Sequence, residues 1–84
     1  MKHVHDQVLD AVAHLNPTEV RTHFEDGTLY VLVVSREYEG TRVMPRIEAL
    51  VNILSEIATE AEQFLCVEPV TPAELLTRRT PWPS

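Results

Sequence analysis

The most regular hydrophobic pattern of the chain joins a fully apolar segment to an amphipathic one. Residues 29–34 are aliphatic or aromatic at every position, so a strand here would be apolar on both faces. Such a strand is typical of the centre of a sheet. From Ile47 the apolar residues recur at helical spacing, which predicts a long helix with one buried stripe and with Pro45 at its first position. The members of this stripe are Ile47, Leu50, Val51, Leu54, Ile57, Ala58 and Ala61.

The N-terminal part of the sequence predicts a helix followed by a hairpin. Apolar residues at helical spacing between Val4 and Leu15 predict a helix over residues 3–15. Residues 18–25 alternate between apolar and polar, as in a half-exposed strand. Asp26-Gly27 then supplies a tight turn, because glycine accepts positive φ without steric cost. The turn should therefore connect this strand to the apolar segment.

The C-terminal part predicts one more strand and a short helix. Residues 64–70 are rich in strand-forming types, but Pro69 cannot donate to a ladder, so the strand should lie at an edge or end at Glu68. Thr71 and Glu74 have the spacing of a capping box, with a proline between them, and predict a helix through about residue 78. Residues 79–84 should form an irregular tail that includes Trp82.

These elements predict one α+β domain over residues 1–78 in the order αββαβα. The long connection between the second and third strands favours a parallel pairing, which gives a three-stranded mixed sheet with the helices on one face. The other face would carry Tyr30, Leu32 and Val34, only partly covered. That face predicts a homodimer or a partner surface.

Composition narrows the function classes. The 84 residues carry a formal charge of -6, from 13 acidic residues against seven Lys and Arg. This balance argues against nucleic acid as a partner, because binding to phosphates rests on clustered cations. No apolar run reaches the roughly 18 residues that span a membrane. Cys66 is the single cysteine and no leader peptide is evident, so we expect a cytoplasmic protein.

Three arginines form the first candidate site. Arg36, Arg42 and Arg46 flank Gly40 just before the long helix, where guanidinium groups and the helix dipole would attract an anion or an acidic partner. The alternative is that these arginines pair with neighbouring acids at positions 37, 39 and 48. A single glycine also falls short of the GxxG loop with which KH domains hold a nucleic-acid backbone.

A metal site has weaker support. His23 and Cys66 lie on the first and third predicted strands and could meet only if their faces coincide. A cysteine in a strand is more often a small core residue, and the histidines of the first helix have the pattern of a solvated surface. The chain also lacks a phosphate-binding loop, a nucleophile elbow and a zinc-protease motif. We therefore expect no cofactor and no enzymatic activity.

The chain resembles the BolA-like family, whose fold is similar to the type II KH domain. The resemblance extends from about Leu15 to Leu75 and is carried by LYVLVVSREYEG, by Arg46 and by LCVEPVTPAEL. It implies a non-enzymatic interaction or regulatory module. It also implies a monothiol glutaredoxin as partner in iron-sulfur traffic, or a role in transcriptional regulation.

One departure from the family bears on cluster binding. The family's metal-ligating histidine follows the arginine, and the matching position here is Ile47. The second ligand of the family lies between the first two strands, where only His23 is near. An aliphatic side chain cannot bind iron, so this departure argues against ligation in the family manner.

A second resemblance, to the minimal nucleotidyltransferase domain, rests on LNPTEV, PRIEALV and TPAEL. The Gly-Ser turn and the paired aspartates of that family are missing here. The resemblance therefore implies a catalytically inactive domain retained for binding. A longer sheet with a nucleotide cleft would favour this second family, and three strands with a plain hairpin would favour the first.

Overall fold

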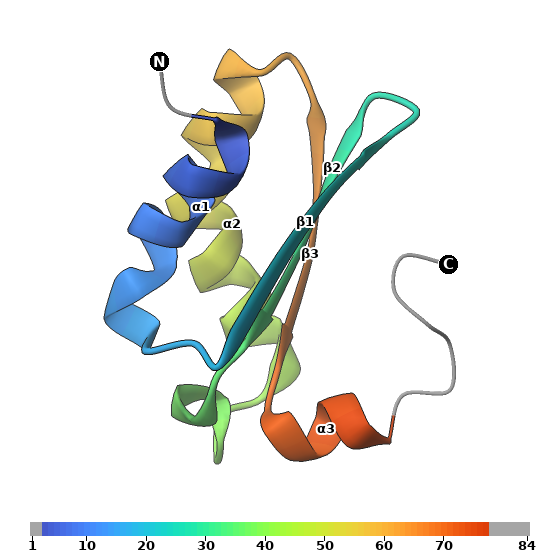
Figure 1. Cartoon of the computed structure of the whole chain (residues 1–84). Coiled ribbons are helices and arrows are strands. Elements are labelled where there is room, and N and C mark those ends of the chain that lie inside the picture. The colour runs from blue at the N-terminus through green and yellow to red at the C-terminus, as the bar shows by residue number, and fades with distance from the viewer. Residues whose placement is uncertain (1–2, 78–84) are drawn as a thin grey trace.

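The computed structural model describes residues 3–77 and shows helices packed against one sheet (Figure 1). The order of elements confirms the predicted αββαβα arrangement and the α+β class. The predicted tail 79–84, with Trp82, lies outside the described residues. The elements are α1 Val4–Val12, the 3-10 turn η1 Ala13–Leu15, β1 Glu19–Glu25, β2 Thr28–Val34, the 3-10 turn η2 Arg36–Tyr38, α2 Val43–Glu60, β3 Phe64–Val70 and α3 Pro72–Leu76.

The sheet has three strands in the order β1-β2-β3. β1 pairs antiparallel with β2 through the Asp26-Gly27 turn, in which both residues have positive φ, and β3 pairs parallel with β2. The three-stranded mixed sheet is therefore confirmed. The central position of β2 explains why its sequence is apolar on both faces. The plain hairpin is the arrangement that favours the BolA-like alternative.

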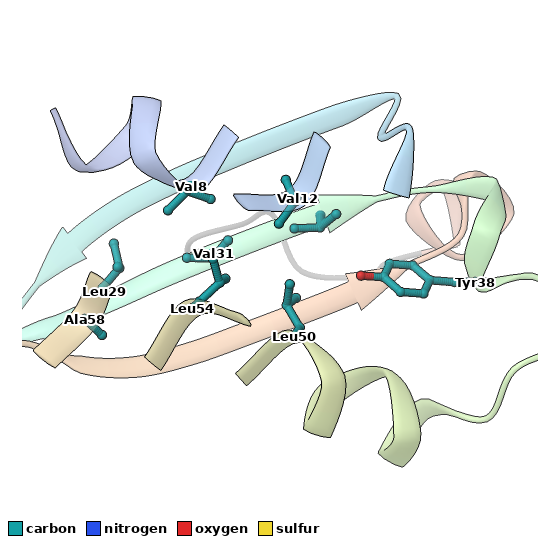
Figure 2. Packing of buried hydrophobic residues seen from close by; sticks show 9 residues of the cluster. Val8, Val12, Leu29, Val31, Tyr38, Leu50, Leu54 and Ala58 are labelled. Atoms are coloured by element: carbon teal, nitrogen blue, oxygen red, sulfur yellow. The ribbon is translucent and has the colours of Figure 1, made fainter. Parts of the chain in front are cut away.

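The core lies between the sheet and the two longer helices (Figures 1 and 2). Leu29, Val31 and Val33 of β2 point toward α1 and α2, as the alternation of a strand requires. Short α3 follows β3 directly and lies beyond the end of that strand (Figure 1). Nine buried residues form the core cluster: Val8, Val12, Leu29, Val31, Val33, Tyr38, Leu50, Leu54 and Ala58.

The buried row of α2 differs from the predicted stripe at its first position. The row recurs every four residues and consists of Arg46, Leu50, Leu54 and Ala58. Ile47 is half-buried and lies outside the core cluster, so its assignment to the core is wrong. Since successive residues of a helix are rotated by about 100°, the row that begins at Arg46 leaves Ile47 at its flank.

The connector before α2 is also more ordered than the sequence suggests. The segment from Ser35 to Met44, which precedes the predicted helix start at Pro45, contains η2 and the start of α2 at Val43. Pro45 is therefore the third helical residue, not the first. Proline fits there because the first N–H groups of a helix have no intrahelical acceptor.

Two predictions about the third strand and its surroundings have clear outcomes. β3 is an edge strand and includes Pro69, and Thr71 and Glu74 form the predicted capping box.

On the face of the sheet away from α1 and α2, Leu32 is 0% exposed and Val34 is 1% exposed. These two side chains are buried within the single chain, so they cannot form the apolar surface on which the homodimer prediction was based.

Candidate functional site

The connector between β2 and α2 is anchored by a buried hydroxyl. Ser35 is 0% exposed, and its Oγ donates to the carbonyl oxygen of Leu15 at 2.5 Å. The same Oγ accepts the backbone N–H of Glu37 at 3.0 Å, which caps η2. The connector therefore leaves the end of β2 in a fixed direction.

The other end of the connector is held by Arg46, which is 6% exposed. Its Nε donates to the carbonyl oxygen of Thr41 at 2.8 Å, and its Nη1 lies 2.6 Å from Oε1 of Glu74. Nη1 also lies 3.5 Å from the carbonyl oxygen of Pro69. Because this one side chain joins α2, the connector, β3 and α3, Arg46 is a structural residue and does not face an external anion.

The Arg46 charge is balanced by Glu74 in the first turn of α3. Oε1 of Glu74 accepts the backbone N–H of Thr71 at 2.8 Å in addition to its contact with Arg46. These two donors favour the charged carboxylate, so the pKa of Glu74 is lowered, with the Thr71 N–H as the larger cause. The capping box and the ion pair thus share one carboxylate group.

Tyr38 of η2 lies against the same arginine. The guanidinium carbon of Arg46 is 5.6 Å from the centroid of the ring, a distance at which the cation is attracted to the aromatic face. Burial raises the pKa of the Tyr38 phenol, and the nearby Arg46 charge partly offsets this effect. The hydroxyl is buried and has no hydrogen-bond partner among the described residues.

The connector also exposes both cationic and apolar side chains. Arg36 and Arg42 are exposed, and within residues 3–77 neither forms an ion pair, so the expected pairing with neighbouring acids is not observed. Gly40 is exposed with φ of 80°, which glycine adopts without strain. Val43 is 52% exposed and Met44 is 62% exposed. We call these five residues the connector surface.

Sequence reasoning missed Val43 and Met44. Both residues precede the proline in what reads as a charged loop, so neither was assigned to a site. A signal was present, because the two apolar residues stand ahead of the helical stripe and are not needed by it. Large apolar side chains next to arginine are typical of protein interfaces.

Comparison with solved structures identifies the fold. BolA1 from Arabidopsis thaliana is 22% identical, with a TM-score of 0.72 over 88% of this chain and 98% of that chain. The chain has the BolA fold. The BolA domain of SufE1 from Arabidopsis thaliana is 17% identical, with a TM-score of 0.66 and coverage of 88% and 98%. A bol-like protein from Babesia bovis is 16% identical, with a TM-score of 0.65 and coverage of 90% and 93%. No protein-family model and no curated protein matches the sequence.

The BolA fold allows the cluster ligands implied by the resemblance to be located. His23 pairs with Tyr30, and this row of the sheet faces away from α1 and α2. Ile47 lies on α2, near the start of the helix and on the opposite side of the sheet. Even a ligating side chain at position 47 would not meet His23. The residues present therefore do not fit a cluster held by these two positions.

His23 and Cys66 are also separated in this BolA fold. Both pair with Tyr30, so they share a face, but β2 runs between them. Neighbouring strands lie about 4.8 Å apart, which places the two backbones roughly 10 Å apart. A metal ion shared by His23 and Cys66 would have to lie about 2.0–2.3 Å from a ligand atom of each side chain. Residues 3–77 contain no group of three metal-ligating side chains.

Proposed function

We propose that this chain is a non-enzymatic interaction module that binds a partner protein through the connector surface. The observation that supports this proposal is that the connector exposes two guanidinium groups, Arg36 and Arg42, which form no ion pair within residues 3–77, together with the apolar side chains of Val43 and Met44. Arginine and methionine are enriched in interfaces, and side chains held on an ordered segment lose less entropy on binding. The hydrogen bonds from Ser35 to Leu15 and from Arg46 to Thr41 keep the connector ordered.

The chemistry of the surface suggests the partner. The chain has a net charge of -6, but its connector surface carries a local pair of cations. This surface would favour a partner protein that presents an acidic patch with an apolar centre. By the BolA resemblance, a monothiol glutaredoxin is the first protein to test. One structural neighbour is the BolA domain of SufE1, so in that protein the fold occurs as a domain, which supports its use here as a module. A regulatory role in the cytoplasm is part of the proposal. Within residues 3–77 no helix is long and apolar enough to cross a membrane.

The experiment is a calorimetric titration of the chain with a monothiol glutaredoxin, without cluster. We expect the double variant Arg36→Glu, Arg42→Glu to weaken binding by about tenfold or more, because two interface charges reverse sign. Met44→Asp should also weaken binding, because it places a charge in the apolar part of the connector surface. Arg21→Glu is the control for charge reversal outside the connector, because Arg21 is exposed on β1 and pairs with Glu19. Equal affinity of the double variant and the control would contradict the proposed surface.

The two alternatives have less support. A nucleotidyltransferase remnant would have a longer sheet, whereas the described residues form three strands. Nucleic-acid binding through Arg36, Arg42 and Arg46 loses one of these three cations, because Arg46 is paired with Glu74. The net negative charge opposes it further.

A further inference from the structure

The outer edge of β1 carries backbone groups that the sheet does not use. The Asp26-Gly27 turn pairs Glu25 directly with Thr28, and both turn residues have positive φ. In such a hairpin the closing pair exchanges both of its hydrogen bonds, and every second residue of the strand then bonds to the same neighbour. The even-numbered residues 20–24 therefore point their N–H and C=O groups outward. Within residues 3–77 no other backbone group bonds to them.

The helix that packs near β1 covers only part of this edge. Nδ1 of His5, in the first turns of α1, lies 2.8 Å from Oγ1 of Thr22, and η1 then leads the chain back to the start of β1 at Glu19. α1 therefore packs near the Glu19 end of the strand. Phe24 shares the helix side of β1 with Thr22, because it lies two residues further along the strand. It is 49% exposed, so the hairpin end of this side is left uncovered.

The opposite side of β1 carries an alternating set of polar side chains. Arg21 and Glu25 are each 51% exposed in their side chains. Arg21 lies 3.0 Å from Glu19, and Nε2 of His23 lies 3.9 Å from Glu25. Pairs this exposed contribute little to stability, so the two groups remain available to an added strand. Charged side chains usually protect an edge strand, so an occupant has to match this pattern.

The pattern is complementary to itself in one antiparallel register. A two-fold axis at His23 places Arg21 of one copy directly opposite Glu25 of the other, and the symmetry repeats this pair. An axis at Thr22 would place Glu19 opposite Glu25, and an axis at Arg21 would place two arginines opposite each other. Directly opposite like charges destabilise a strand pair, whereas opposite charges stabilise it. The charges therefore select the register centred on His23.

The same register uses the outward backbone groups and covers Phe24. Thr22 of one copy faces Phe24 of the other, and each of these two pairs exchanges N–H···O bonds across the edge. Each Phe24 ring then lies beside the other copy's Thr22 and His5. The two α1 helices do not collide, because each packs near the Glu19 end of its own strand and these ends lie on opposite sides of the axis.

The other edge strand, β3, is less suited to a second copy. Pro69 has no N–H to donate to a ladder. α2 also packs on β3, so a copy at that edge would bring two long helices together. Neighbouring strands lie about 4.8 Å apart, whereas packed helices need about 8–10 Å. The edge of β1 lacks both obstacles.

We propose that the outer edge of β1 binds a second copy of this chain by antiparallel strand addition around a two-fold axis at His23. The two three-stranded sheets then form one continuous sheet. The contact is small, so we expect a dimer that forms at high protein concentration. It uses an edge of the sheet, unlike the homodimer predicted from the sequence, which used a face. It also uses a different surface from the connector and does not depend on the glutaredoxin proposal.

The first test is sedimentation velocity at neutral pH with protein concentrations up to about 1 mM, the range of weak affinities. We expect a monomer–dimer equilibrium. Arg21→Glu should weaken the dimer by about tenfold or more, because two attractive pairs become repulsive. The double variant Arg21→Glu, Glu25→Arg restores opposite charges and should restore the dimer. The Arg36→Glu, Arg42→Glu variant is the control and should dimerise normally, which separates this inference from the proposed function.

Cross-linking tests the register. In a Cys66→Ser background, His23→Cys places two thiols opposite each other at a Cα separation of about 4.5 Å, which a disulfide can span. Diamide takes two electrons and two protons from the thiols, so it should link the two copies. Thr22→Cys in the same background is the matched control, because position 22 faces position 24 in this register. It should link much more slowly. Circular dichroism verifies that the variants fold.

Four results would overturn the proposal. A monomer at the highest concentration would exclude the second copy as the occupant of this edge. A dimer that Arg21→Glu does not weaken would place the contact elsewhere. Failure of the charge-swapped double variant to dimerise would remove the pairing of Arg21 with Glu25. Equal linking of Thr22→Cys and His23→Cys would exclude the axis at His23.

Discussion

The Nη1 atom of Arg46 lies 2.6 Å from Oε1 of Glu74, and this contact joins the first turns of α2 and α3. The arginine is 6% exposed, whereas the glutamate side chain is 44% exposed. The pair therefore lies at the boundary between core and solvent. It fixes the base of the connector surface relative to the end of β3.

Arg46→Met should destabilise the chain. The methionine keeps the apolar stem but removes the donors to Thr41 and Glu74 and the cation over Tyr38. We expect a loss of about 1–3 kcal/mol, below the range for a fully buried pair because Glu74 is partly solvated. Urea denaturation followed by circular dichroism measures this loss. A change smaller than about 0.5 kcal/mol, the usual range for surface substitutions, would show that the contact is not structural.

The stabilising effect of Glu74 should depend on pH. Its folded-state pKa is lowered, first by the Thr71 N–H and then by Arg46. The stabilisation is therefore fully present above the ordinary value of 4.5 and is lost as the pH falls through the lower folded-state value. The difference in urea midpoint between the natural chain and Glu74→Gln should be largest near neutral pH and shrink in acid. A difference that stays constant with pH would contradict this assignment.

Ser35→Ala should loosen the connector. The substitution removes the donor to Leu15 and the cap on the N–H of Glu37, and it leaves a partly buried carbonyl oxygen without this donor. We expect a cost of about 1–2 kcal/mol. Hydrogen exchange at Glu37 should become faster than in the natural chain. Unchanged exchange at that amide would mean that the connector holds its shape without the serine.

Tyr38→Phe should leave the stability of the chain unchanged or raise it, in contrast to the substitutions above. The hydroxyl is buried without a partner among the described residues, so its removal eliminates an unsatisfied polar group and keeps the ring under Arg46. We expect a stability between unchanged and about 1 kcal/mol higher. Thermal unfolding measures this. A clear loss of stability would indicate that the hydroxyl is hydrogen-bonded in solution, for example to a water molecule.

The position of Ile47 predicts the behaviour toward iron-sulfur clusters. Mixing the chain with a monothiol glutaredoxin and a reconstituted cluster should produce no histidine-ligated heterodimer, because an aliphatic side chain provides no ligand. Visible absorption and circular dichroism report on such a species. A BolA protein that carries the histidine is the positive control. The heterodimer spectrum with the natural chain would overturn the prediction.

The fold could be predicted from the sequence because its local signals agree with its tertiary structure. The apolar run of β2, the Asp26-Gly27 turn and the Thr71 capping box each specify one element, and no element contradicts another. The start of α2 was predicted too late because Pro45 is compatible with several positions in a first helical turn.

The candidate site could be predicted only in part. The sequence places Arg36, Arg42 and Arg46 in one cluster, but it does not reveal that Arg46 points inward to Glu74, twenty-eight positions away. A long-range ion pair leaves no periodic signal. For the same reason the burial of Leu32 and Val34 was missed, because the elements that cover a sheet face are not encoded in the strand itself.

The parallel pairing of β2 with β3 also has a consequence for the order of folding. β1 and β2 are joined by a two-residue turn and can pair as soon as that turn forms, whereas Thr28 meets Phe64 only after the whole of α2 has been placed. Closing the longer loop costs more chain entropy and slows the encounter. We expect the hairpin to form early and the docking of β3 to limit the folding rate, so the last strand to arrive is also the one that leaves its outer edge open.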